Sequence, residues 1–192
     1  MESLLQSRER FEMFGASHQA VVVLSLLLAL VLVRLGRSGR GLSVHRWLPR
    51  ALGVLIVVSE LVFVTYPLYL GNFAASWGLP LQLCDLTALV AGLGLITLDA
   101  FALEVGFFLG LSATMLTTLT PDLARDFPHV EFLCFFLTHA LVSVAMLYVA
   151  FGLDRRPRPG AALKGWLAVN LYGLVAAEIN IVLGSNYLYI CR

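Results

Sequence analysis

The chain has 192 residues, of which 59% are hydrophobic and 13% are charged, and its mean hydropathy is +0.87. Soluble domains carry about a quarter charged residues, so this composition excludes an ordinary soluble globule and a disordered chain. A formal net charge of +1 excludes the strong positive field of a nucleic-acid binder. Three cysteines are too few, and odd in number, for a disulfide framework. We therefore expect a polytopic membrane protein.

Six apolar stretches are long enough, or nearly so, to cross the hydrocarbon core, which takes about 20 helical residues. They lie at 18–35, 48–70, 79–98, 101–119, 130–153 and 163–189. Only short loops remain, so residues 1–192 are predicted to form a single integral membrane domain, an all-α transmembrane bundle. Pro80 is expected in the first turn of the third helix. Gly106 and Gly110 either let another helix approach the fourth closely or are chance glycines in an apolar helix.

Basic residues concentrate in two of the predicted loops. These are Arg34, Arg37, Arg40, Arg46 and Arg50 in the first loop, and Arg155, Arg156, Arg158 and Lys164 in the fifth. Loops rich in lysine and arginine face the cytoplasm, so we expect a multi-pass protein of the cell membrane with its N-terminus outside. Six spans would also leave Arg192 outside, where the chain looks unfinished.

Polar side chains inside the spans share one layer on this topology, at mid-depth or in the outer half of the membrane. They are Glu60, Gln82, Cys84, Asp85, Thr138, His139, Glu178 and Asn180. Such residues are costly in hydrocarbon and need partners. Their common depth predicts a polar cavity that opens outward or to the outer leaflet. Structural interpretations are also open: His139, Gln82 and Asp85 could simply form hydrogen bonds between helices, and Cys84 could be a small apolar filler.

Cys84 and His139 are the two members of this layer whose chemistry suits acyl transfer. A thiolate attacks a carbonyl carbon, and an adjacent imidazole takes the thiol proton and later returns it. Glu60, Asp85 and Glu178 are candidates to orient that imidazole. A cysteine buried far from a base is inert, so the hypothesis needs both helices to meet. The histidine and cysteine spacings match no zinc motif, and we expect neither metal nor cofactor.

Several segments resemble the bacterial YwaF-like integral membrane family. They are Phe14–His18, Leu79–Leu86, Leu119–Leu123, Phe127–Phe132, Phe135–His139 and Gly184–Tyr187. That family is similar, more remotely, to the eukaryotic transmembrane protein 164, which is regarded as a lipid acyltransferase using a cysteine and a histidine. The resemblance implies that Cys84 and His139 take these roles. Gln82 departs from the family, which usually has histidine there, and the family normally continues into a seventh span.

We therefore expect a lipid acyltransferase or acyl hydrolase that acts on membrane lipids, with Cys84 as nucleophile and His139 as base. The supporting residues would be Gln82, Asp85, Glu60, Glu178, Thr138 and Asn180. A lipid or small-molecule carrier is an alternative, and it would have helices broken at its site. A non-catalytic scaffold is another, and it would have no cavity.

Overall fold

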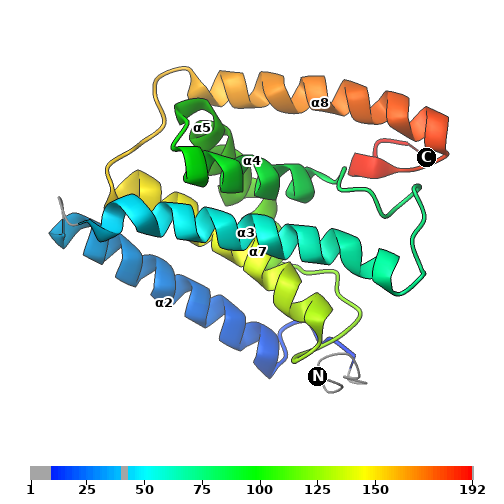
Figure 1. Cartoon of the computed structure of the whole chain (residues 1–192), viewed down its shortest axis with the longest axis horizontal. Helices are drawn as coiled ribbons and strands as arrows, with labels where there is room; N and C mark the ends of the chain where they lie inside the picture. Colours follow the sequence, from blue (N-terminus) through cyan, green and yellow to red (C-terminus); the bar gives the residue numbers. More distant parts are fainter. Residues whose placement is uncertain (1–9, 40–42, 192) are drawn as a thin grey trace.

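The computed structural model describes residues 10–39 and 43–191, and this part of the chain is helical without a β-sheet (Figure 1). The α-helices are α2 (Ala16–Ser38), α3 (Val44–Tyr69), α4 (Leu83–Thr97), α5 (Ala100–Leu109), α6 (Met115–Leu119), α7 (Val130–Leu147) and α8 (Ala161–Leu183). Two π-helical turns, η1 (Gly110–Thr114) and η2 (Tyr148–Gly152), and a 3-10 turn, η3 (Tyr187–Tyr189), complete the list. The predicted all-α fold is confirmed. Arg40 and Arg192 lie outside the described residues.

Five helical segments of the described chain are long and apolar enough to cross a membrane. They are Ala16–Ser38, Val44–Tyr69, Ala100–Leu119, Val130–Gly152 and Ala161–Leu183, and they coincide with the first, second, fourth, fifth and sixth predicted spans. α4 coincides with the third, but its 15 residues are fewer than a span usually needs. The count of six spans and the side of the N-terminus stay predictions.

The third and sixth helices are shorter than predicted. α4 begins at Leu83, so Pro80 lies in the preceding non-helical segment and not in the first helical turn. The Gln82 N–H donates to the Asp85 carboxylate at 2.9 Å, which satisfies one of the donors that a helix start leaves unpaired. α8 ends at Leu183 because Gly184 adopts a left-handed φ of +60°.

The central helix is α7, which packs against α2, α3 and the α5–α6 segment (Figure 1). Glycines allow the neighbouring helices to come close. A Cβ on Gly106 would lie 3.0 Å from the Ala91 Cβ, and one on Gly110 would lie 2.9 Å from the Val142 Cγ1. The predicted role of Gly106 and Gly110 in close helix packing is therefore confirmed.

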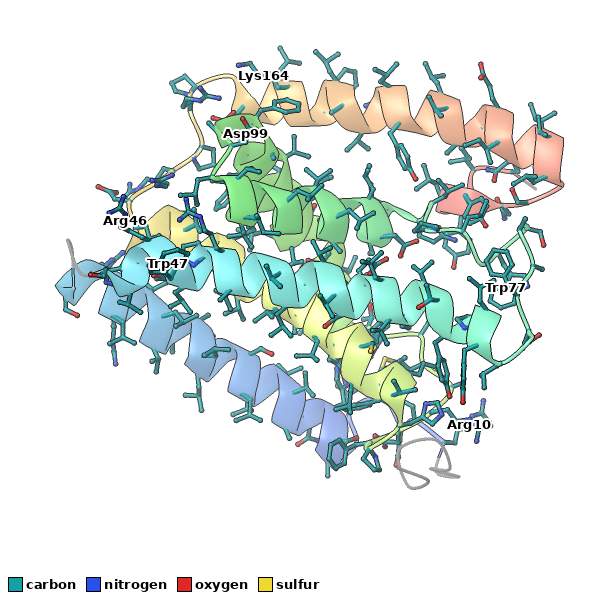
Figure 2. All side chains as sticks on the ribbon, in the orientation of Figure 1. Arg10, Arg46, Trp47, Trp77, Asp99 and Lys164 are labelled. Carbon is teal, nitrogen blue, oxygen red and sulfur yellow. The ribbon has the colours of Figure 1, made fainter. Side chains whose placement is uncertain are left out.

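The two ends of the bundle differ in charge. We call one end the basic end, because its described basic residues are Arg34, Arg37, Arg46, Arg50, Arg155, Arg156, Arg158 and Lys164. Only three described acidic residues, Asp99, Glu104 and Asp154, lie there. Figure 2 shows Arg46, Trp47, Asp99 and Lys164 at this end, and Trp77 and Arg10 at the opposite one. This separation is the pattern from which the positive-inside rule assigns a cytoplasmic face.

Cysteine accessibility in intact cells tests that assignment. In a background without native cysteines, Asp154→Cys at the basic end is expected to resist a membrane-impermeant maleimide until the cells are permeabilised. Asn72→Cys, in the segment between α3 and α4, is expected to react in intact cells. If Asp154→Cys were labelled in intact cells, the basic end would face outward and the predicted orientation would be wrong.

Candidate functional site

Cys84 is the second residue of α4, and its side chain is half-buried. Its Sγ lies 3.4 Å from the Thr117 Oγ1 on α6. The Thr117 hydroxyl already donates its hydrogen to the Ala113 carbonyl at 2.9 Å. Because a hydroxyl has one hydrogen to give, the Cys84 thiol must be the donor in its contact with Thr117. The thiol is thus held in one direction and needs a different group to accept its proton during a reaction.

Beside Cys84, two carboxyl groups from different helices meet. Glu60 on α3 is 1% exposed, and its side chain lies beside that of Asp85 on α4. Two carboxyl groups that lie side by side can share a hydrogen bond only if one of them carries a proton. Glu60 Oε1 is buried and has no hydrogen-bond partner. Asp85 directly follows Cys84 in α4, so this carboxyl pair lies near the candidate nucleophile.

His139 on α7 is buried, with 5% of its surface exposed. Its Nδ1 lies 2.8 Å from the Phe135 carbonyl oxygen, and its ring stacks on that of Phe135 with centroids 4.2 Å apart. A carbonyl only accepts, so Nδ1 carries the hydrogen and Nε2 has the free lone pair of a base. In the described structure no hydrogen bond joins His139 to Cys84. The neighbouring Thr138 Oγ1 is buried without a partner.

The π-helical turn η1 explains how polar groups reach the bundle interior from an apolar span. A π turn leaves carbonyl oxygens without their usual helical donors. The Gly110 carbonyl accepts from Ser143 Oγ at 2.8 Å and from Thr114 Oγ1 at 2.7 Å. The inserted residue also rotates the following helix, so that Thr117 faces Cys84. Sequence reasoning missed Thr117, although threonines at helical spacing in an apolar span are a usable signal.

Asn180 is buried on α8, and its side chain folds the turn that follows this helix. Nδ2 donates to the Tyr187 carbonyl at 2.9 Å. Oδ1 accepts from Ser185 Oγ at 2.8 Å and from the Tyr187 N–H at 2.7 Å. The described hydrogen bonds of the Asn180 side chain all lie within this turn. Asn180 can therefore affect the candidate site only indirectly, by fixing the shape of the turn.

The turn after α8 is hydrogen-bonded to the segment that leads into α4. The Tyr187 hydroxyl donates to the Ala75 carbonyl at 2.8 Å and accepts from the Leu79 N–H at 2.9 Å. The Gln82 Oε1 accepts from the Leu188 N–H at 3.0 Å. Gln82 thus couples the C-terminal turn to the helix that carries Cys84. Glu178 is exposed on the other side of α8, and the structure does not bring it to the group around Cys84.

A cavity of about 370 Å³ opens at the end of the bundle opposite the basic end. Its lining includes the aromatic rings of Phe63, Tyr66 and Trp77 and the polar side chains of Gln82, Asp85 and Glu131. Two predicted site residues, Gln82 and Asp85, therefore line it, whereas Cys84 and His139 are not in its described lining. His129 caps α7 near this cavity, and burial lowers the pKa of its imidazole.

A second, apolar cavity of about 450 Å³ lies between α2 and α7. Side chains of both helices, such as Val21, Leu28, Phe136 and Leu141, line it. It runs from the level of Phe127 to that of Val144, along a face of α7 that does not carry His139. Among the described residues, no three histidine, cysteine or acidic side chains gather as metal ligands would.

The sequence of this chain is similar to known proteins. Residues 13–192, which include every residue of the candidate site, match the TMEM164 family. The chain is also 28% identical to an uncharacterized protein of Treponema pallidum (strain Nichols) over 182 residues, which cover 95% of this chain and 76% of that protein. No solved structure matches the chain. The narrower resemblance to YwaF-like proteins stays a prediction.

Proposed function

The chain belongs to the TMEM164 family, and we propose that it is a lipid acyltransferase of the cell membrane in which Cys84 is the nucleophile and His139 the general base. One observation carries the proposal. A cysteine thiol, a threonine hydroxyl and a pair of carboxyl groups from three helices meet inside an apolar bundle. Polar groups are costly at such depth, and those that are present usually mark a functional site.

The reaction would proceed in two balanced steps. The Cys84 Sγ attacks the carbonyl carbon of a lipid ester while His139 Nε2 takes the thiol proton. The ester C–O bond then breaks, and the leaving alkoxide receives that proton, which leaves an acyl thioester on Cys84. A hydroxyl of an acceptor lipid next attacks the thioester carbonyl and gives its proton to Nε2. The C–S bond breaks, and the proton returns to the sulfur.

The hydrogen bonding of His139 suits this role. Because Nδ1–H is committed to the Phe135 carbonyl, the neutral ring is held in the tautomer that offers Nε2 as a base. Nucleophile and base are often further apart in a substrate-free enzyme than in its reactive complex. An approach of α4 and α7 on lipid binding would bring the Cys84 Sγ and His139 Nε2 together.

Two buried oxygens without partners support a polar ligand at this level. Glu60 Oε1 and Thr138 Oγ1 each lack a hydrogen bond in the described structure. A buried polar group left unpaired costs about 1–3 kcal/mol, so a substrate group that bonds to either one recovers that cost. We assign Glu60, Asp85 and Thr138 to holding the polar part of the lipid near Cys84.

Trapping of the acyl thioester is the direct test. The purified protein is incubated with a phospholipid that carries an alkyne-tagged acyl chain, and the labelled peptide is identified by mass spectrometry. We expect a hydroxylamine-sensitive acyl group on Cys84. Cys134→Ala and Cys191→Ala are the matched controls, and both should keep the label. An acyl group on wild-type Cys134 or Cys191 with none on Cys84 would refute the assignment of the nucleophile.

Lipid binding without transfer is the second candidate function. The apolar cavity between α2 and α7 favours it, because the cavity has the character of a site for hydrocarbon chains. This function predicts binding of the tagged lipid with no covalent adduct, and binding that Cys84→Ala leaves unchanged. It also predicts that Leu28→Trp, which fills the cavity, weakens binding.

A further inference from the structure

A third cavity, of about 250 Å³, lies at the basic end of the bundle, far from Cys84. Its floor is apolar and is formed by side chains of α5, α7 and η2, among them Leu103, Phe107 and Met146. Its rim is formed by the segment after η2, which contributes Arg155, Arg156 and Arg158. The cavity therefore combines an apolar floor with a cluster of guanidinium groups at its rim.

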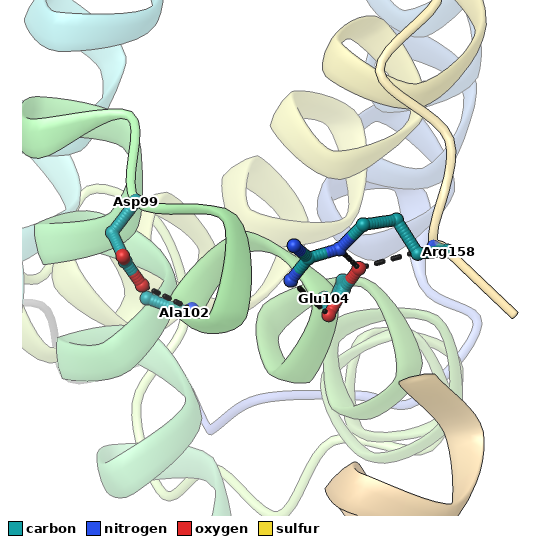
Figure 3. A network of polar contacts seen from close by, with 4 residues as sticks. All are labelled: Asp99, Ala102, Glu104 and Arg158. Atoms are coloured by element: carbon teal, nitrogen blue, oxygen red, sulfur yellow. Dashed lines mark hydrogen bonds and ion pairs between the residues drawn. The ribbon is translucent and has the colours of Figure 1, made fainter. Parts of the chain in front are cut away.

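A buried carboxylate anchors this rim (Figure 3). Glu104 on α5 is 5% exposed. Its Oε1 accepts from Arg158 Nε at 2.6 Å and from the Arg158 N–H at 3.0 Å, and its Oε2 accepts from Nη2 at 3.0 Å. The carboxylate raises the pKa of the Arg158 guanidinium above its ordinary value. Such two-pronged pairing fixes geometry as well as charge, so Glu104 holds the arginine-rich segment over the cavity.

The other two rim arginines keep much of their capacity to bind an anion. Arg156 forms an exposed ion pair with Asp154 at 3.4 Å and lies over the Phe151 ring. Exposed pairs of this kind are weak, so an anion can compete for Arg156. The Arg155 guanidinium has no hydrogen-bond or ion-pair partner among the described residues. The surrounding basic end has eight described basic side chains against three acidic ones, which adds a positive field.

We propose that this cavity binds the phosphate headgroup of an anionic phospholipid, with Arg155 and Arg156 as its ligands and Glu104 and Arg158 as its positioning residues. Basic pockets at the ends of membrane helices are suited to such headgroups. The apolar floor selects a lipid over free phosphate, because only a lipid offers hydrocarbon next to its anionic group. The site is separate from Cys84 and does not depend on acyl transfer.

Lipid-dependent stability of the purified protein tests this proposal. Unfolding is followed in neutral detergent with added phosphatidylglycerol, phosphatidylcholine or inorganic phosphate. We expect phosphatidylglycerol to stabilise the wild type more than the other two do. The double variant Arg155→Gln/Arg156→Gln should weaken its apparent affinity about 10- to 30-fold, since each basic residue near an anionic surface contributes about 1 kcal/mol.

A charge-matched control separates a built site from a diffuse field. Arg34→Gln/Arg46→Gln removes two charges from the same end without touching the cavity lining, and it should change the affinity less than about threefold. An equal loss in both double variants would overturn the proposal, as would equal stabilisation by inorganic phosphate or by phosphatidylcholine. The replaced arginines are exposed, so both variants should unfold like the wild type without lipid. Should the cavity double variant fail to fold, Arg155→Gln alone gives the same comparison.

Discussion

His139→Ala is expected to lower the rate of acyl transfer by about 10²- to 10⁴-fold, the usual contribution of a positioned general base. The variant removes Nε2 as the acceptor for the Cys84 proton, and it also removes the stacking on Phe135. Rates are measured with a tagged phospholipid in nanodiscs under single-turnover conditions. Cys84→Ala should abolish transfer altogether and leave the bundle folded, because it removes one small, half-buried side chain.

His129→Asn is the matched histidine control for this experiment. Asparagine retains a side-chain acceptor for the Glu131 N–H, which His129 Nδ1 now accepts at 3.2 Å. We expect transfer within about threefold of the wild type, since His129 lies at the start of α7 and not beside Cys84. Thermal unfolding of each variant separates lost chemistry from lost structure. A folded His139→Ala protein with full activity would remove this histidine from the mechanism.

Gly53→Ala is expected to destabilise the protein by about 1–3 kcal/mol, the usual cost of overpacking. Gly53 lies where α3 crosses α4, and a Cβ there would meet the Gly92 carbonyl oxygen at 2.5 Å and the Leu95 Cβ at 2.8 Å. The nearest obstacle is backbone, which cannot swing aside, so the helices must separate. Because Glu60 and Asp85 lie on these two helices, the same change should weaken acyl transfer.

Gly173→Ala on α8 is the control for Gly53→Ala. A Cβ at Gly173 meets nothing within 4 Å. Alanine also favours the helix by up to about 1 kcal/mol over glycine. Its thermal unfolding in detergent should therefore match or exceed that of the wild type. Equal unfolding temperatures for the two variants would contradict the close crossing of α3 and α4.

Local features of the chain could be predicted from the sequence because they depend on residues that are neighbours in the sequence. Apolar runs of about 20 residues mark helices whatever packs around them, and five predicted spans coincide with long apolar helices of the described structure. The close approach at Gly106 and Gly110 was readable for the same reason, as small residues leave room for any partner. Membership of the TMEM164 family also lies in the sequence.

The polar layer was only partly readable. Its members were visible as rare residue types in apolar helices, and Glu60 and Asp85 do meet. Their partners were not visible, because hydropathy does not record how a helix is rotated. The π turn η1 changes that rotation in mid-span and turns Thr117 toward Cys84. Glu178 lies on the exposed side of α8. It was expected near the site because the rotation of α8 about its axis could not be predicted from hydropathy.

The sequence alone determined the helical membrane class, the approximate helix ranges and the set of polar residues available for chemistry. Tertiary structure decided which of them meet: Cys84 with Thr117, Glu60 with Asp85, and Glu104 with Arg158. The physical reason is the range of the forces involved. Burial of a helix in hydrocarbon is summed along its own residues, whereas a hydrogen bond or ion pair exists only within about 3 Å. That distance is set by the rotation and packing of helices far apart in the chain.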